Sequence, residues 1–317
     1  MVGSSAGGEQ PKFLADVLAA EGGIRSVLVK FSSADASPVS QRWADLLCCE
    51  HLAAQTLYAQ QVPCARTQML DVGGRRFLEV ERYDRPNGAG RRGVVTLGAI
   101  EDAFVPEDPA DWIDAARRLE AAQVISPADA QALQWRWCFG DLIGNTDMHR
   151  ANASFWLGDK LPFSLAPAYD MVPMLYAPGA QGDLGERTLS RRPPLPRIAA
   201  VWAEAAVAAA DFWRRVTADE RISADFRAIA AYCADQIDRL RDRYRCPPSV
   251  SPSAYPLPLS PFRSALGLPR RSPWANAGLP SLPDMLRWLW RDYPRPDDPH
   301  DDRNRTLLEP ASALAKS

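Results

Sequence analysis

Three polar residues near the middle of the chain have the types and the spacing that phosphoryl transfer needs. Asp147 and Asn152 lie five positions apart. This D-x-x-x-x-N spacing is the one with which kinases place a catalytic base and a magnesium ligand on one short turn. Asp170 follows in the same irregular stretch, where a second metal ligand is expected, because Mg²⁺ prefers hard oxygen atoms. The pattern predicts a site for ATP and Mg²⁺.

A lysine and a glutamate nearer to the N-terminus fit the same chemistry. Lys30 ends the apolar run VLVK, as the phosphate-binding lysine of a kinase strand does. Glu50 lies in the next expected helix, where it would hold Lys30 in register through an ion pair. The plainer alternatives are a surface lysine whose stem lies along apolar neighbours and a solvated helix charge.

The first residues include the glycine-rich stretch SSAGGEQPKF at 4–13. Gly7 and Gly8 allow positive φ and a close approach of the backbone to phosphate groups, and Lys12 adds a cation nearby. The stretch predicts a loop that covers the phosphates of ATP. An ordinary turn is the alternative, because a single glycine-rich segment is a weak signal.

The segments around these residues predict a small first lobe. Residues 24–32 form an apolar, β-branched run typical of a strand, and 43–60 have apolar positions at helical spacing. Residues 66–85 have the pattern of two strands joined by a turn at VGG. We therefore expect residues 1–85 to form a β-rich nucleotide-binding lobe with one helix.

The following part, 86–246, is expected to be a mainly helical catalytic lobe. Strong helical patterns, several with Pro or Ser-Pro at the start, cover 109–124, 126–144, 195–216 and 223–245. Between the second and third of these, 145–173 is expected to form a loop, a hairpin and another loop.

The last part, 247–317, holds half of the 28 prolines. No packed core is expected there, and the tail is predicted to be disordered. A short amphipathic helix at 282–293 is the one regular element that its sequence suggests.

The composition narrows the function classes. The 317 residues carry a net charge of -2, which gives no basic field for nucleic acid, so we expect no direct nucleic-acid binding by this chain. No apolar run reaches the roughly 18 residues of a membrane span, and the N-terminus lacks a signal-peptide pattern; we expect a cytoplasmic protein without membrane contact. Six cysteines without a C-x-x-C pair and three histidines argue against a disulfide framework and a zinc site.

Five segments together resemble the HipA family of bacterial serine/threonine kinases, its YjjJ-like branch most of all. They are SSAGGEQPKF, VLVKFS, VERYDR, GDLIGNTDMHRANASF and LAPAYDMVPMLYAP, and the resemblance runs from about Ser4 to Tyr244. It is specific, because the family has N-T-D-x-H-x-x-N in its catalytic segment and Y-D in its metal motif. The resemblance implies an α+β, two-lobed protein-kinase-like fold, with a small β-rich N-terminal lobe and a mainly α-helical C-terminal lobe.

The resemblance also implies roles for the matching residues of the catalytic centre. It makes Asp147 the catalytic base, and it makes Asn152 and Asp170 the magnesium ligands. Lys30 is implied to contact the ATP phosphates. His149 either orients Asp147, contacts phosphate or packs as a loop anchor.

Two further groups of residues match the family outside the catalytic loop. Glu81, Arg82 and Tyr83 of VERYDR match the adenine-binding hinge, for which a plain strand end is the alternative. Ser4 and Ser5 stand where members carry an autophosphorylated serine. A phosphate there adds roughly two negative charges and is implied to draw the phosphate loop away from ATP.

The resemblance implies an ATP- and Mg²⁺-dependent protein serine/threonine kinase, the toxin of a toxin-antitoxin system. Its implied substrate is a translation component such as an aminoacyl-tRNA synthetase, and its implied partner a helix-turn-helix antitoxin. Two alternatives stay open: a small-molecule kinase of the aminoglycoside-phosphotransferase type, and a catalytically silent regulator that binds a nucleotide or a partner. Family members carry a further subdomain before the glycine loop, so we expect this chain to be truncated at its N-terminus.

Overall fold

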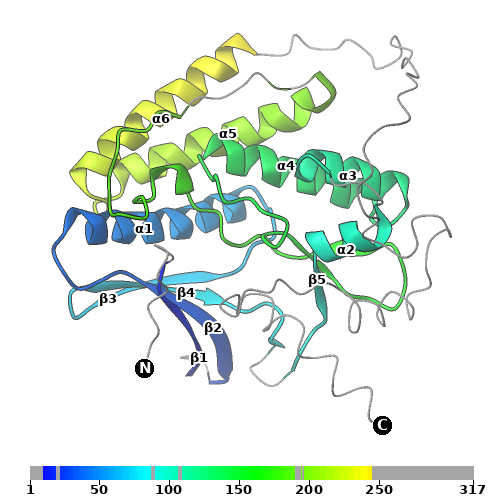
Figure 1. Ribbon diagram of the computed structural model, residues 1–317, viewed down its shortest axis with the longest axis horizontal. Helices are drawn as coiled ribbons and strands as arrows, with labels where there is room; N and C mark the ends of the chain where they lie inside the picture. Colours follow the sequence, from blue (N-terminus) through cyan, green and yellow to red (C-terminus); the bar gives the residue numbers. More distant parts are fainter. Residues whose placement is uncertain are drawn as a thin grey trace.

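The computed structural model places a small antiparallel sheet beside a larger helical part (Figure 1). The structure describes residues 10–18, 22–86, 90–105, 109–189, 194 and 196–244. The expected tail and its short helix lie outside the described residues.

Four antiparallel strands in the order β1-β2-β4-β3 form the first sheet. Their bounds are Lys12–Leu18 (β1), Ile24–Phe31 (β2), Thr67–Val72 (β3) and Arg75–Glu81 (β4). The predicted strand at 24–32 and the hairpin at 66–85 are confirmed. Gly73 and Gly74 make the hairpin turn with φ of 58° and 73°, which two-residue turns between twisted strands require.

Strand β1 corrects the expectation that the stretch at 4–13 is a loop to its end. Lys12 is the first residue of β1 and pairs with Lys30 of β2. The pairing satisfies backbone groups that would otherwise be left open at the edge of β2, and the ring of Phe13 packs 5.9 Å from that of Phe31. Lys12 is therefore held by a strand ladder and not by a loop.

Helix α1, Pro38–Ala59, covers one face of this sheet (Figure 1). It begins earlier than the predicted 43–60, because Ser37 accepts a hydrogen bond from the amide of Ser40 and Pro38 fits the first helical position. Leu47 packs with Leu78 of β4 in a small core between helix and sheet. Another side of α1 faces α5.

Among the described residues, the helical part holds the four predicted helices and one that was not predicted. They are α2 (Leu97–Phe104), α3 (Trp112–Ala121), α4 (Pro127–Leu142), α5 (Ala199–Ala218) and α6 (Ala224–Arg243), with 3-10 turns at Met174–Tyr176 and Pro196–Ile198. The predicted helices are confirmed as α3 to α6. Helix α2 escaped prediction because its eight residues make about two turns, too few for a clear 3.6-residue period.

A second sheet has three strands, two of which lie within the stretch at 145–173. Its strands are β5 (Val94–Thr96), β6 (Ser154–Trp156) and β7 (Ser164–Leu165), in that order. The hairpin expected within 145–173 is confirmed by the pairing of β6 with β7, and β5 adds an unpredicted strand. The loops before β6 and after β7 carry the candidate catalytic residues.

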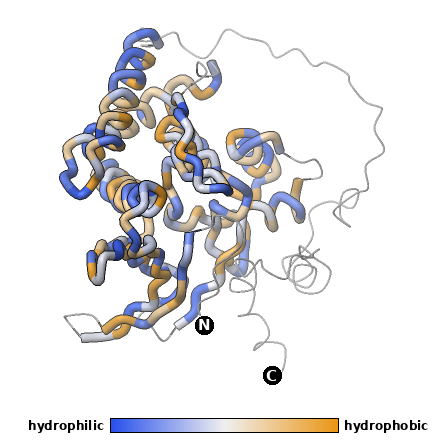
Figure 2. Tube along the Cα trace, turned by 60° about the vertical axis from the view of Figure 1, so that its left-hand side comes forward, coloured by the Kyte–Doolittle hydropathy of each residue, from blue (hydrophilic) through white to orange (hydrophobic). Residues whose placement is uncertain are grey.

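The main core extends from α1 to α6, and several of its largest side chains lie on α4, α5 and α6. Phe139, Phe212, Trp213 and Phe226 are fully buried there, and Phe212 and Trp213 lie edge to face at 4.9 Å. Figure 2 shows hydrophobic and hydrophilic residues interspersed along the helices, as expected for helices with one buried side. This core holds the helices that flank the loops before β6 and after β7.

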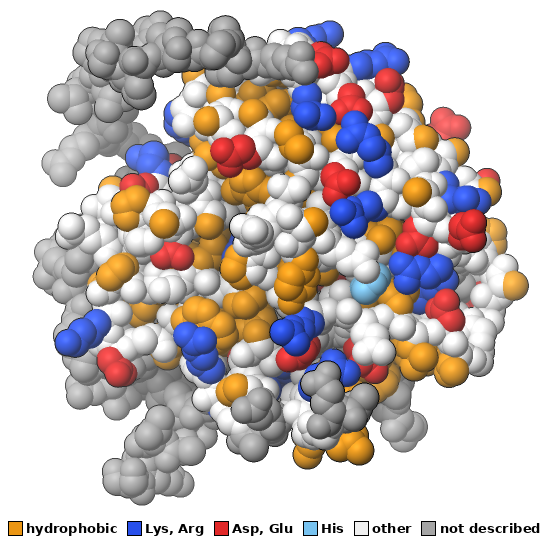
Figure 3. All heavy atoms as spheres, turned by 180° about the vertical axis from the view of Figure 1, so that it is seen from behind, with side chains coloured by type: hydrophobic (Ala, Val, Ile, Leu, Met, Phe, Trp, Pro, Cys, Tyr) orange, Lys and Arg blue, Asp and Glu red, His pale blue; other side chains and the backbone are white. Residues whose placement is uncertain are grey.

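One face of the molecule carries interspersed acidic and basic side chains, as Figure 3 shows. This mixture agrees with the small net charge of -2. Within the described ranges, no helix combines the length and the apolar character that a membrane crossing demands.

Candidate active site

A buried lysine joins two carboxylates at the centre of the site. Lys30 Nζ lies 2.8 Å from both carboxylate oxygens of Glu50 and 2.5 Å from Oδ1 of Asp170. Lys30 is 7% exposed and Glu50 4% exposed. The ion pair predicted between Lys30 and Glu50 is confirmed, and the alternatives of a surface lysine and a solvated helix charge are wrong. Three elements therefore meet here: β2, α1 and the loop after β7.

Opposing effects set the protonation of these three groups. Burial alone would lower the pKa of Lys30, but the charges of Asp170 and Glu50 outweigh it and raise the pKa above its ordinary value. Burial raises the pKa of Glu50 against the opposing charge of Lys30. Burial also acts to raise the pKa of Asp170, but the charge and hydrogen bond of Lys30 lower it overall. When both carboxylates are ionised, they and the ammonium carry a net charge of about -1, which a further cation would neutralise.

The backbone of Asp170 is in the left-handed region. Its φ is +58°, which is uncommon for a residue with a side chain and marks functional sites where the surroundings hold the strain. The carbonyl oxygen of Asp170 accepts a hydrogen bond from Asn145 Nδ2 at 3.2 Å. The preceding Tyr169 donates from its hydroxyl to the carbonyl of Ala151 at 2.6 Å. These contacts hold the loop after β7 against the loop before β6.

The loop between α4 and β6 brings Asp147 and Asn152 together. Asn152 Nδ2 donates to the carbonyl oxygen of Asp147 at 2.6 Å, and the Asn152 amide donates to the carbonyl of His149 at 3.0 Å. Asn145 Oδ1 accepts from the Asp147 amide at 3.0 Å. Since Asn145 also bonds to Asp170, one side chain connects both candidate loops.

Asn145 is a residue that the sequence reasoning missed. It stands in the quoted segment GDLIGNTDMHRANASF, but only Asp147, His149 and Asn152 of that segment received a role. Asn145 is 5% exposed, and a buried amide needs hydrogen-bond partners on both its oxygen and its nitrogen. The sequence could have indicated this role, because a polar residue shortly after the end of an apolar helix is often buried and then needs hydrogen-bond partners.

His149 lies beside Asp147 at the surface of the same loop. Its Nε2 is 3.9 Å from Asp147 Oδ1, with the two side chains 40% and 46% exposed. Its Nδ1 accepts a hydrogen bond from the Ala151 amide at 3.2 Å. The geometry brings the imidazole close enough to orient the carboxylate of Asp147, and its bond to the backbone equally anchors the loop.

A further missed residue, Arg150, fixes this loop to α2. Its Nε lies 2.9 Å from Glu101 Oε2, and its guanidinium lies 2.5 Å from Asp102 Oδ1. The amides of Leu97 and Gly98 donate to the carbonyls of Ala153 and Arg150 at 2.8 and 3.0 Å. The first amides of a helix have no partner within it, so the loop supplies acceptors that α2 needs.

The expected adenine hinge lies at the end of β4. Arg82 directs its guanidinium to Asp84, at 3.0 and 2.7 Å, and its amide donates to the carbonyl of Ser26. The ring of Tyr83 lies 5.4 Å from Trp156 and 5.9 Å from Tyr169. Glu81 is the last residue of β4. The side chains of Arg82 and Tyr83 thus have protein partners, and the amides of Glu81 and Arg82 donate to the carbonyls of Arg66 and Ser26.

The remaining predicted residues lie at the N-terminus. Ser4, Ser5, Gly7 and Gly8 fall outside the described residues. Lys12, at the start of β1, acts on the pKa of both Asp170 and Glu50, since its charge lowers each. The structure therefore brings Lys12 near Lys30 and the two carboxylates.

Asn152 and Asp170 carry oxygen atoms of the kind that Mg²⁺ prefers. Among the described residues no group of three or more His, Cys, Asp and Glu side chains could hold a metal. Asn152 donates through Nδ2 to Asp147, so its Oδ1 is directed elsewhere, and Asp170 keeps Oδ2 outside its contact with Lys30. Two such oxygen atoms would suit Mg²⁺, for which water and phosphate would supply the further ligands.

The sheet, the helix that pairs with its lysine, and the helical second part define a protein-kinase-like fold. The proinflammatory kinase CtkA of Helicobacter pylori superposes with a TM-score of 0.51 at 12% identity, covering 77% of this chain and 93% of CtkA. At that identity the likeness concerns the fold alone. HipA of Shewanella oneidensis MR-1, solved with HipB and operator DNA, gives a TM-score of 0.48 at 19% identity, over 76% of this chain and 65% of that chain. The predicted α+β fold is confirmed.

The sequence profile of the HipA-like C-terminal domain matches residues 4–239, and the chain belongs to this family. Toxin YjjJ of Escherichia coli strain K12 is 39% identical over 244 residues. The match covers 77% of this chain and 54% of YjjJ, so the chain spans about half the length of that relative. The family predicted from the five segments is confirmed.

Proposed function

We propose that this chain is an ATP- and Mg²⁺-dependent protein serine/threonine kinase. The observation that carries the proposal is the contact of Lys30 with both Glu50 and Asp170 inside the protein. A buried lysine that two carboxylates keep charged is a fixed cation for the α- and β-phosphates. The kinase fold and the family membership support the same reading.

Mg²⁺ would be held by Asn152 and Asp170. When bound, it would neutralise phosphate charge that develops during transfer. Two hydrogen bonds would position these ligands. Asn145 donates to the backbone carbonyl of Asp170, and the side-chain amide of Asn152 donates to the carbonyl of Asp147. Both ligand side chains are thus positioned before nucleotide binds, which lowers the cost of ordering them.

Asp147 is the proposed general base. Its carboxylate is 46% exposed, so a hydroxyl on a protein substrate can approach it from outside. Asn145 and Asn152 fix its backbone from both sides. A carboxylate placed in this way accepts the hydroxyl proton as the bond to the γ-phosphate forms.

The N-terminal stretch and the end of β4 are proposed to enclose the nucleotide. Gly7 and Gly8 would cover the phosphates and Lys12 would add a second cation, while the backbone at 81–83 would meet the adenine. Ser4 and Ser5 are proposed autophosphorylation sites, where a phosphate dianion would compete with ATP for Lys12.

Within the cell we propose that the kinase is the toxin of a toxin-antitoxin system. Support comes from the family membership and from the 39% identity to Toxin YjjJ. The proposed substrate is an aminoacyl-tRNA synthetase or another translation component, and the proposed partner is a helix-turn-helix antitoxin.

Phosphoryl transfer tests the proposal directly. Purified chain is incubated with γ-labelled ATP and Mg²⁺, alone and with a ribosome-free extract, beside the matched variant Asp147→Asn. The expected result is label on this chain and on extract protein for the wild type, lost in the variant. Label confined to small molecules would favour an aminoglycoside-type kinase. Nucleotide binding without any transfer would favour a silent regulator and overturn the proposal.

A further inference from the structure

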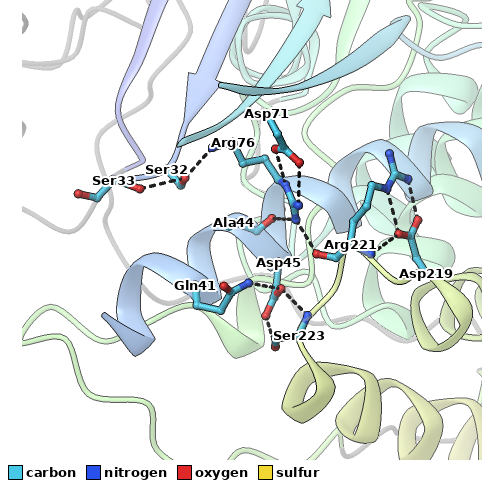
Figure 4. Close-up of polar contacts among 10 residues, drawn as sticks. All are labelled: Ser32, Ser33, Gln41, Ala44, Asp45, Asp71, Arg76, Asp219, Arg221 and Ser223. Atoms are coloured by element: carbon cyan, nitrogen blue, oxygen red, sulfur yellow. Dashed lines mark hydrogen bonds and ion pairs between the residues drawn. The ribbon is translucent and has the colours of Figure 1, made fainter. Parts of the chain in front are cut away.

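Helix α1 is joined to the helical part through a buried carboxylate, that of Asp45 (Figure 4). Asp45 is 1% exposed. Its Oδ1 accepts hydrogen bonds from the Ser223 amide at 2.9 Å and from Gln41 Nε2 at 3.1 Å, and its Oδ2 accepts from Ser223 Oγ at 2.5 Å. Both oxygens are therefore occupied, as the burial of a charge requires.

The partner of Asp45 is the first turn of another helix. Ser223 is the N-cap residue of α6, and its Oγ accepts from the Phe226 amide at 3.3 Å. A carboxylate at this end is favoured by the helix dipole. It comes from a residue 178 positions away in the sequence, so the contact fixes α1 relative to α6.

A second contact reaches the same turn from the sheet (Figure 4). Arg76 of β4 donates to the carbonyl oxygen of Arg221 at 2.8 Å. Asp71 of β3 holds the Arg76 guanidinium at 2.9 and 3.0 Å. The turn between α5 and α6 thus contacts both the sheet that carries the buried lysine and the helix that carries its glutamate.

We propose that Asp45 is a positioning residue that acts through Glu50, an inference that rests on the proposed kinase function. The two lie five positions apart on α1, which is about 140° around a helix. Glu50 therefore faces Lys30 while Asp45 faces α6. Without its bonds to Ser223, α1 loses its anchor on α6, and the carboxylate of Glu50 is expected to shift relative to the ammonium.

The first test measures how readily Lys30 is acylated and does not depend on enzyme activity. Folded protein is treated briefly with an acylating reagent, and the modification of Lys30 is followed by peptide mass spectrometry. Asp45→Ala should raise the rate at Lys30 several-fold, toward the rate in Glu50→Ala, because a displaced or missing Glu50 carboxylate no longer covers Nζ. Asp238→Ala is the matched control, since it removes a carboxylate that joins α5 to α6 at 2.5 Å from Arg214. A wild-type rate at Lys30 in folded Asp45→Ala overturns the inference.

The second test separates positioning from a general loss of structure. In the wild-type background Asp45→Ala should raise the KM for ATP about tenfold, a rough factor for one displaced binding group, and in the Glu50→Gln background it should add nothing. Equal effects in both backgrounds contradict an action through Glu50. If Asp45→Ala does not fold, Asp45→Asn replaces it, with a smaller increase expected at Lys30. An inactive wild type would refute the kinase proposal, while the acylation test would still decide the role of Asp45.

Discussion

Lys30 and Asp170 form an ion pair with 2.5 Å between Nζ and Oδ1, although 140 positions separate them in the sequence. Lys30 comes from β2 and Asp170 from the loop after β7, so the pair connects the sheet to the helical part. Glu50 shares the same ammonium. The ammonium of Lys30 therefore contacts both buried carboxylates at once.

Replacing this cation should harm both activity and stability. Lys30→Met leaves the carboxylates of Glu50 and Asp170 without their partner. We expect phosphoryl transfer to fall at least a hundredfold and the free energy of unfolding to fall by about 3 kcal/mol, the usual cost of an unpaired buried charge. The double variant Lys30→Met/Glu50→Leu should regain part of the stability in urea unfolding but none of the activity. A double variant no more stable than the single one would argue against this charge balance.

The two carboxylates should give opposite pH dependences of stability. The pKa of Asp170 is lowered in the folded protein, so its contribution is present above the unfolded pKa of about 3.9 and is lost as pH falls through the folded pKa. The pKa of Glu50 is raised, so its contribution declines as pH rises from about 4.3 through the folded pKa. Urea unfolding of wild type, Asp170→Asn and Glu50→Gln from about pH 2, well below the unfolded pKa of Asp170, to about pH 7 measures both differences. Parallel pH profiles for the two variants would be the contrary result.

Asp147 and Asp170 should differ in which kinetic constant they affect. Asp147→Ala should lower kcat at least a hundredfold with ATP affinity nearly unchanged, because a base acts mainly in the transition state. Asp170→Ala should also weaken Mg²⁺-dependent nucleotide binding, since it removes a metal ligand. Steady-state kinetics with calorimetric titration of ATP, with and without Mg²⁺, separates the two. Full activity of Asp147→Ala would remove its assignment as the base.

The sequence predicted the elements with long, regular patterns and the residues with distinctive types. Helices α3 to α6 and the ion pair of Lys30 with Glu50 are of this kind. Strand β1 and helix α2 were not foreseen, because one lies beside a glycine-rich stretch and the other is short. Asn145 and Arg150 were missed for another reason: their roles come from contacts between loops that only the folded chain brings together.

The contact of Arg150 with α2 gives the last prediction, through Gly98. A Cβ at Gly98 would lie 3.0 Å from Arg150 Nε and 3.1 Å from Arg150 Cβ, so Gly98→Ala must push the arginine aside. Because the Gly98 amide also binds the Arg150 carbonyl at 3.0 Å, the displacement reaches the loop that carries Asp147. We expect kcat to fall about tenfold, the rough effect of small shifts in a positioned group, with little change in melting temperature, since alanine has a higher helix propensity than glycine.

Gly158→Ala is the matched control for this variant. There a Cβ would meet only the carbonyl oxygen of Lys160, at 3.8 Å, which is an ordinary contact. It should leave kcat and melting temperature unchanged, because nothing has to move. If Gly98→Ala is as active as Gly158→Ala, then Arg150 tolerates displacement and α2 does not position the catalytic loop. If both variants lose activity together with stability, the effect is one of folding, and Arg150 has no separate influence on Asp147.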